Sequence, residues 1–197
     1  MKRSLVLLVV ASLVFAGVAG AAVQKGDAEI EALGSYQNWN APSGGGDDMT
    51  AWSIAAGLGY FLTDNIRVGV AGMYSDAEYQ FMVPTELKKL GIGANVKYHF
   101  MPANLFVPYI GAQIFWENWD VTQSADVPDG GGETIAWEDS GSTDGILYGP
   151  LAGLRYELNS NNDIFVEFQY NFYAGDISDD LAESGCAIFA GIVHQFK

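Results

Sequence analysis

Apolar residues recur at every second position in eight separate runs of the chain. The fourth run is the clearest, because Leu90, Ile92 and Ala94 alternate with Gly91 and Gly93. A period of two indicates a β-strand, and no stretch of helical period and useful length interrupts the series. The sequence therefore predicts an all-β fold whose eight strands cover residues 28–36, 52–62, 66–74, 90–100, 106–116, 146–156, 164–172 and 188–196.

The connections between the runs alternate between short and long. Short turns are expected at residues 63–65, 102–104 and 159–163, and longer segments at 38–49, 76–86, 118–143 and 175–183. This alternation is typical of an up-and-down transmembrane β-barrel with periplasmic turns and extracellular loops. We predict an eight-stranded antiparallel barrel in which the Gly- and Asp-rich segment 121–145 forms a mobile exposed loop.

Charged residues within the runs avoid the apolar set of positions. Arg or Lys on the lipid face at mid-membrane costs about 2–4 kcal/mol, so the apolar set should face lipid and the other set the interior. Lys88 falls on the apolar set but lies at the outer rim. Because unpaired buried charge is costly, we expect the interior charges to pair into a polar plug, with a proton or ion path as the alternative. They are Glu29, Glu31, Arg67, Lys89, Lys97, Glu117, Arg155, Glu157 and Glu167.

A soluble sandwich would show the same alternation, and the positions of the aromatic residues separate the two folds. Membrane interfaces favour aromatic girdles on either side of an aliphatic belt, which a sandwich core does not explain. The expected periplasmic girdle is Tyr60, Tyr98, Phe100, Phe106, Tyr156 and Phe196. The expected extracellular girdle is Tyr36, Trp52, Tyr74, Trp116, Tyr148 and Phe172. The last strand should pair with the first, because an open edge is not tolerated in hydrocarbon.

The first 21 residues have the pattern of a secretory signal peptide. A basic start at Lys2 and Arg3 precedes an apolar run and an Ala-x-Ala site, so we expect cleavage after Ala21 or Ala22 and one barrel domain over residues 22–197. Removing the two basic residues leaves seven against 24 acidic ones, a net charge of about −17 that excludes nucleic acid as a partner. The single cysteine, Cys186, forms no internal disulfide.

Three segments resemble the small outer-membrane β-barrel family of Gram-negative bacteria, whose members include OmpX-like, OmpW-like and OmpA-barrel proteins. They are Val107 to Ala112, Phe165 to Tyr170 and Gly191 to Phe196, and the resemblance covers essentially the whole chain after residue 21. Lys197 departs from the pattern, since family members usually end on the aromatic residue. The resemblance implies an outer-membrane location, contact with lipid and lipopolysaccharide, recognition by the barrel-assembly machinery, and a monomer.

Some barrels of this size modify lipid A, so an enzyme has to be considered. Such chemistry needs a Ser-His pair facing the outer leaflet. The only two histidines, His99 and His194, both fall at the expected periplasmic rim, and the sequence shows no metal-ligand spacing, nucleotide loop or cofactor motif. We therefore expect no enzymatic activity, no catalytic residue and no cofactor.

Two functions from different classes stay open. The first is a structural or surface-interaction barrel whose acidic loops repel neighbouring chains or bind divalent cations that bridge lipopolysaccharide phosphates. The second is a narrow pore for small or hydrophobic solutes, similar to what is proposed for OmpW-like proteins. Glycines such as Gly91 and Gly93 on the inward face favour some room, whereas the inward charges favour a plug, and eight strands leave space only for side chains.

Overall fold

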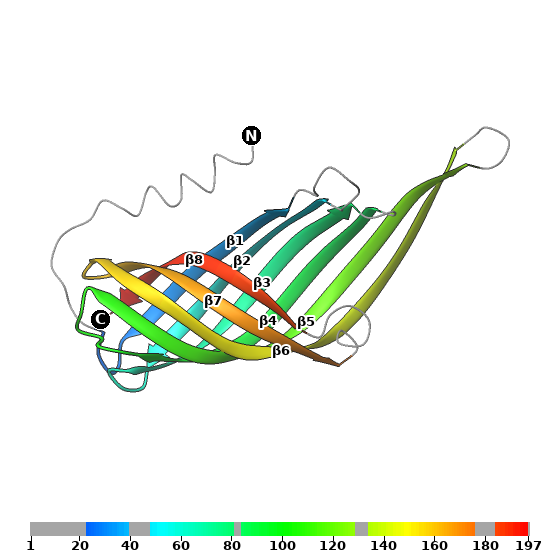
Figure 1. The fold of residues 1–197 in the computed structure, drawn as a ribbon. Coiled ribbons are helices and arrows are strands. Elements are labelled where there is room, and N and C mark those ends of the chain that lie inside the picture. Colours follow the sequence, from blue (N-terminus) through cyan, green and yellow to red (C-terminus); the bar gives the residue numbers. More distant parts are fainter. Residues whose placement is uncertain (1–22, 40–47, 81–83, 129–133, 176–183, 197) are drawn as a thin grey trace.

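The computed structural model describes residues 23–39, 48–80, 84–128, 134–175 and 184–196. Eight strands follow one another along the chain and close into a barrel (Figure 1). They are β1 (Ala28–Trp39), β2 (Asp48–Phe61), β3 (Ile66–Gln80), β4 (Pro84–His99), β5 (Phe106–Pro128), β6 (Thr134–Asn159), β7 (Asn162–Gly175) and β8 (Ser184–Phe196). The predicted fold class is confirmed. The signal peptide expected over residues 1–21 lies outside the described residues.

Each strand pairs antiparallel with its neighbours in sequence, and β8 returns to pair with β1. This closing ladder runs from Ala28 opposite Phe196 to Gly34 opposite Ala190. No helix long and apolar enough to cross a membrane occurs in the described part of the chain.

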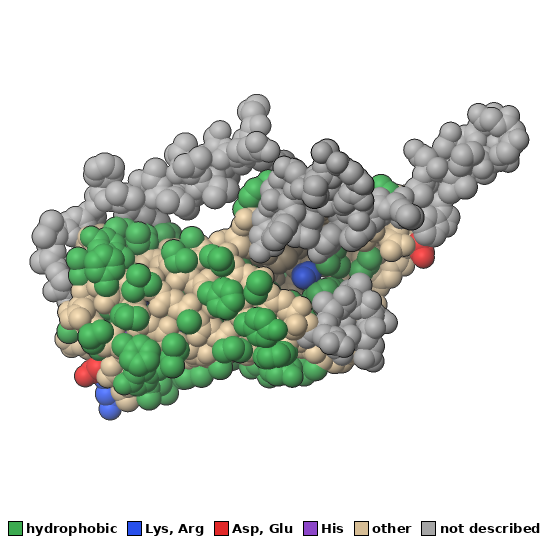
Figure 2. All heavy atoms as spheres, in the orientation of Figure 1, with side chains coloured by type: hydrophobic (Ala, Val, Ile, Leu, Met, Phe, Trp, Pro, Cys, Tyr) green, Lys and Arg blue, Asp and Glu red, His purple; other side chains and the backbone are tan. Residues whose placement is uncertain are grey.

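The predicted alternation of the strands is confirmed by the exposure of their side chains. Outward residues such as Leu58 and Ile92 are 58% and 65% exposed, whereas the inward Phe61 and Arg67 are fully buried. Apolar side chains accordingly spread over the barrel wall, and the charged side chains visible in Figure 2 lie towards its two ends. The wall therefore has an apolar exterior and a mixed, largely polar interior, which is the inverse of a soluble protein.

The prediction of a loop over residues 121–145 is wrong for most of that segment. Strands β5 and β6 continue to Pro128 and Thr134, and their ladder runs unbroken from Phe106–Tyr156 to Pro128–Thr134. The resulting hairpin projects well beyond the other strands (Figure 1). Both faces of the projecting part lie beyond the apolar wall, so its sequence has no reason to alternate between apolar and polar residues.

Two other connections are shorter than the sequence predicts. Strand β3 extends to Gln80 and β4 begins at Pro84, so most of residues 76–86 is strand. At the opposite end of the barrel, only residues 160 and 161 separate β6 from β7. We call the end with the turns after β2, β4 and β6 the short-turn end, and the other the long-loop end.

Candidate functional site

Arg67 lies at the centre of a buried ionic network in the short-turn half of the lumen. Its Nε is 2.6 Å from Glu29 Oε1, and its Nη2 is 3.1 Å from Glu31 Oε1. Its Nη1 donates a hydrogen bond of 2.5 Å to Asn95 Oδ1 on β4. One guanidinium on β3 thus links β1 to β4, and its planar fork of donors suits this role.

The network continues around the barrel through two further cations. Lys97 Nζ lies 3.1 Å from Glu31 Oε2 and 2.8 Å from Glu167 Oε2. Arg155 Nη1 lies 2.8 Å from Glu29 Oε2, and its Nε pairs with Asp163. We call the seven residues the ionic ring: Glu29, Glu31, Arg67, Lys97, Arg155, Asp163 and Glu167.

Neutral polar side chains extend the ionic ring towards the middle of the barrel. Glu167 accepts hydrogen bonds from Tyr109 Oη at 3.0 Å and from Gln169 Nε2 at 2.8 Å. Gln113 in turn donates to Gln169 and Asn171. Most of the buried polar side chains thus have partners, as interiors require.

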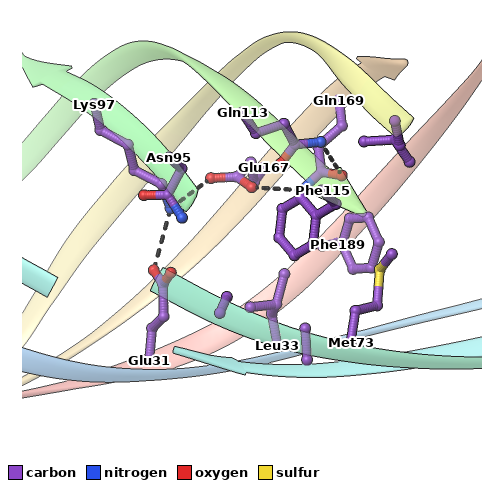
Figure 3. Close-up of a pocket in the computed structure, with 13 residues that line it drawn as sticks. Glu31, Leu33, Met73, Asn95, Lys97, Gln113, Phe115, Glu167, Gln169 and Phe189 are labelled. Atoms are coloured by element: carbon purple, nitrogen blue, oxygen red, sulfur yellow. Dashed lines mark hydrogen bonds and ion pairs between the residues drawn. The ribbon is translucent and has the colours of Figure 1, made fainter. Parts of the chain in front are cut away.

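A small cavity lies next to the ionic ring, on the side of the long-loop end. Glu31, Lys97, Glu167 and Gln169 line it together with Phe115 and other side chains, as Figure 3 shows. Its volume is about 20 Å³, which is enough for about one water molecule. No solute larger than water fits there.

Two inward glycines give their neighbours the room to cross the lumen. A Cβ on Gly59 would fall on the guanidinium of Arg67, and one on Gly93 would fall on the ring of Phe115. The space that these glycines leave is therefore already filled, in agreement with the narrow interior of an eight-stranded barrel.

The long-loop half of the lumen is built around Trp119. The buried indole packs with Ala77 and Leu87, and Tyr173 meets it edge-on with ring centroids 5.4 Å apart. Its Nε1 donates to Glu117 Oε2 at 2.8 Å. The ammonium of Lys89 lies 3.7 Å from the centroid of the ring, a cation–π distance. We call these residues the aromatic cluster.

The structure places eight of the nine predicted interior charges in two groups. Six belong to the ionic ring, whereas Lys89 and Glu117 contact Trp119 in the other half of the lumen. Glu157 is half-buried and lies opposite Asp163 in the β6–β7 register. The sequence reasoning missed Asp163, because it assigned this residue to a turn. The alternation of β7 would have placed Asp163 on the inward face, two positions before Phe165.

The aromatic residues predicted as girdles all point outward. At the short-turn end, Phe106 and Tyr156 pair with ring centroids 4.8 Å apart. At the long-loop end, Trp52 packs with Tyr74 at 5.4 Å, and Tyr148 with Phe172 at 5.6 Å. Aliphatic side chains such as Ile54 and Val70 lie between the two bands.

Neither histidine forms a nucleophile–base pair with a described serine. His99 is buried between Phe61 and Tyr109, with ring centroids 5.3 Å from each. His194 is exposed, and its Nδ1 lies 2.9 Å from Asn162 Oδ1. Both lie at the short-turn end, as the sequence indicates.

No group of three or more His, Cys, Asp or Glu residues among the described side chains is arranged to hold a metal ion. Many acidic residues of the predicted cation sites fall outside the described residues or have undescribed side chains: Asp47, Asp126, Asp129, Glu133, Asp176, Asp179, Asp180 and Glu183. Cation binding therefore stays a prediction.

The fold has counterparts among solved structures. Neisserial surface protein A matches with a TM-score of 0.60 and 21% identity, covering 87% of this chain and all of that one. Ail, the attachment invasion locus protein of Yersinia pestis, matches with a TM-score of 0.54 and 13% identity over 87% of this chain and 99% of its own. At these identities the likeness concerns the fold alone.

Sequence comparison adds a relative and a family. A protein of Haemophilus influenzae described as uncharacterized is 29% identical over 133 residues, which cover 65% of this chain and 69% of that protein. Residues 6–185 match the model of the outer membrane protein beta-barrel domain. The chain belongs to this family, and it is a β-barrel of the Gram-negative outer membrane.

Proposed function

We propose that the protein is a closed, non-enzymatic outer-membrane barrel that acts in membrane structure or surface interaction through its long-loop end. Short turns of such barrels face the periplasm, so the long-loop end is extracellular. The ionic ring is the observation that supports the proposal, because it joins five strands across the lumen through buried charges. Opening a path through the ring would break buried ion pairs and leave charges without partners. Each broken pair would cost about 3–5 kcal/mol of stability.

The filled interior argues against the alternative, a pore for small or hydrophobic solutes. Arg67 and Phe115 occupy the space beside Gly59 and Gly93. The cavity next to the ring has room for about one water molecule. The aromatic cluster then packs Trp119 into the extracellular half of the lumen.

Planar-bilayer conductance of the refolded protein tests the closed lumen. We expect no single-channel steps from the unaltered protein. Arg67 and Arg155 both join β1 to other strands across the lumen. The folded double variant Arg67→Ala with Arg155→Ala should therefore show single-channel steps. Clear single-channel steps from the unaltered protein would overturn the proposal in favour of the pore.

The same proposal includes the partners of the barrel. The outward aliphatic belt and the two aromatic bands suit direct contact with lipid and lipopolysaccharide. The carboxyl-terminal strand β8 closes the barrel against β1 and is the segment expected to engage the assembly machinery. The expected monomeric state is checked by light scattering of the detergent-solubilised protein.

A further inference from the structure

The β5–β6 hairpin has one long edge that no described strand covers. Strand β7 pairs with β6 only as far as Gly145, opposite Gly175. Beyond that point β6 continues from Asp144 back to Thr134 with β5 as its partner. This edge is 11 residues long and contains no proline. We call residues 134–144 the β6 edge.

The opposite edge of the hairpin is different. Strand β4 covers β5 as far as Gln123, opposite Thr85, which leaves only Ser124 to Pro128 uncovered. This edge is short and ends in a proline, and both features disfavour pairing with another strand. The β6 edge has neither protection.

The register shows which backbone groups of the β6 edge point away from β5, towards the side that no described strand covers. The amide of Glu157 donates to the carbonyl of Leu105, and hydrogen-bonded pairs alternate along an antiparallel ladder. Odd-numbered residues of β6 therefore bond to β5, whereas even-numbered ones direct their N–H and C=O groups to the other side. Pro150 agrees with this assignment. It is even-numbered and has no N–H to donate towards β7, and the β6–β7 pairing is interrupted at this residue. Within the β6 edge, Ser140 and Ser142 thus direct donors and acceptors away from the hairpin.

The charge of the hairpin determines which strand fits this edge. Between Asp120 and Asp144 the sequence has no Lys, Arg or His and has seven acidic residues: Asp120, Asp126, Asp129, Glu133, Glu138, Asp139 and Asp144. Edge-to-edge pairing of two copies would bring like charges together, which is unfavourable. A basic strand would instead be attracted, since cross-strand pairs of opposite charge are stabilising.

We propose that the β6 edge binds an extended, basic segment of another protein by strand addition. Backbone hydrogen bonds to even-numbered residues give the affinity, and opposite charges on the facing side chains select the partner. Glu138 and Asp144 lie on the same face of the strand, six positions apart, so basic residues on one face of the ligand meet both. The inference rests on the proposed surface-interaction function and gives it a site and a class of partner.

Binding of a synthetic peptide tests this site. The probe is a fluorescent 11-residue peptide of alternating Lys and Thr, which places every lysine on one face of a strand. We expect it to bind the full-length refolded barrel in detergent micelles, as measured by fluorescence anisotropy. We also expect it to slow hydrogen exchange of the Ser140 and Ser142 amides, whereas a Glu–Thr peptide of the same length should not bind.

A pair of proline variants separates strand addition from attraction between charges. Ser140→Pro with Ser142→Pro removes two donors from the β6 edge without removing a hydrogen bond to β5, so peptide affinity should fall about tenfold. Ser124→Pro introduces one proline on the opposite edge of the hairpin and should leave affinity unchanged. Equal binding by all three proteins, or equal binding of a peptide N-methylated at alternate residues, would overturn the proposal.

The peptide and bilayer experiments distinguish failure of the β6-edge site from failure of the proposed function. If the unaltered protein shows no channel steps and the peptide does not bind, the β6-edge site is overturned and the closed barrel is retained. Channel steps from the unaltered protein would remove the proposed function, and with it the basis of this site.

Discussion

The two halves of the lumen fill the same narrow space with different chemistry. In the periplasmic half, Arg67, Lys97 and Arg155 each contact two carboxylates, and those of Lys97 and Arg155 come from different strands. In the extracellular half, Trp119 packs against apolar side chains and takes a single cation on its ring. The ionic ring joins specific strands through directional bonds, whereas the aromatic cluster fills volume.

This difference indicates a division of roles within the barrel. Buried ion pairs contribute little net stability, but breaking them is costly, so they suit a region that has to stay closed. Aromatic packing tolerates changes in shape better, and it supports the base of the projecting hairpin through β5 and β6. We therefore propose that the periplasmic half keeps the lumen closed and that the extracellular half makes the contacts with partners.

The largest expected effect comes from removing the centre of the ionic ring. Arg67→Met should lower the free energy of unfolding by about 3–5 kcal/mol, because it leaves Glu29 and Glu31 with fewer cationic partners in a buried site. Urea unfolding of the barrel in lipid vesicles measures this change. Lys89→Met is the matched change in the extracellular half and should cost less, since it removes one cation–π contact. Equal losses from the two variants would erase the contrast between the halves.

An intermediate effect is expected in the aromatic cluster. Trp119→Phe keeps most of the packing but removes the donor to Glu117, so unfolding should become easier by about 1–3 kcal/mol. Trp116→Phe is the control, because Trp116 lies on the outer surface and donates to the exposed Asp144 at 3.2 Å. A control variant as unstable as Trp119→Phe would show that the buried hydrogen bond is not the cause.

The smallest effect is expected at the rim. Lys88 pairs with Glu86 at 2.7 Å, but both side chains are more than 40% exposed and water screens the pair. Lys88→Met should therefore leave the urea midpoint unchanged within error, at low and at high salt. A clear, salt-dependent loss would mean that rim charges stabilise the barrel as the ionic ring does.

Much of the barrel could be predicted from the sequence, because the bilayer forces each strand to alternate. Lipid-facing Ile92 and lumen-facing Lys97 follow directly from that rule. The same rule carries no signal beyond the membrane, which is why the strands around Glu138 were predicted as loop. The sequence also does not predict which side chains pair with one another inside the lumen. Lys89 and Lys97 share a strand face, yet one contacts Trp119 and the other joins Glu31 to Glu167.

The closing ladder of the barrel has a consequence for the order of folding. It pairs β1 with β8 only from Ala28–Phe196 to Gly34–Ala190, which makes it much shorter than the β5–β6 ladder. Its partners are also the most distant along the chain. Joining distant segments costs more loop entropy, and a short ladder returns fewer hydrogen bonds for it. We therefore expect the β1–β8 seam to be the last ladder to form and the first to open, so that its closure sets how fast the barrel matures in the membrane.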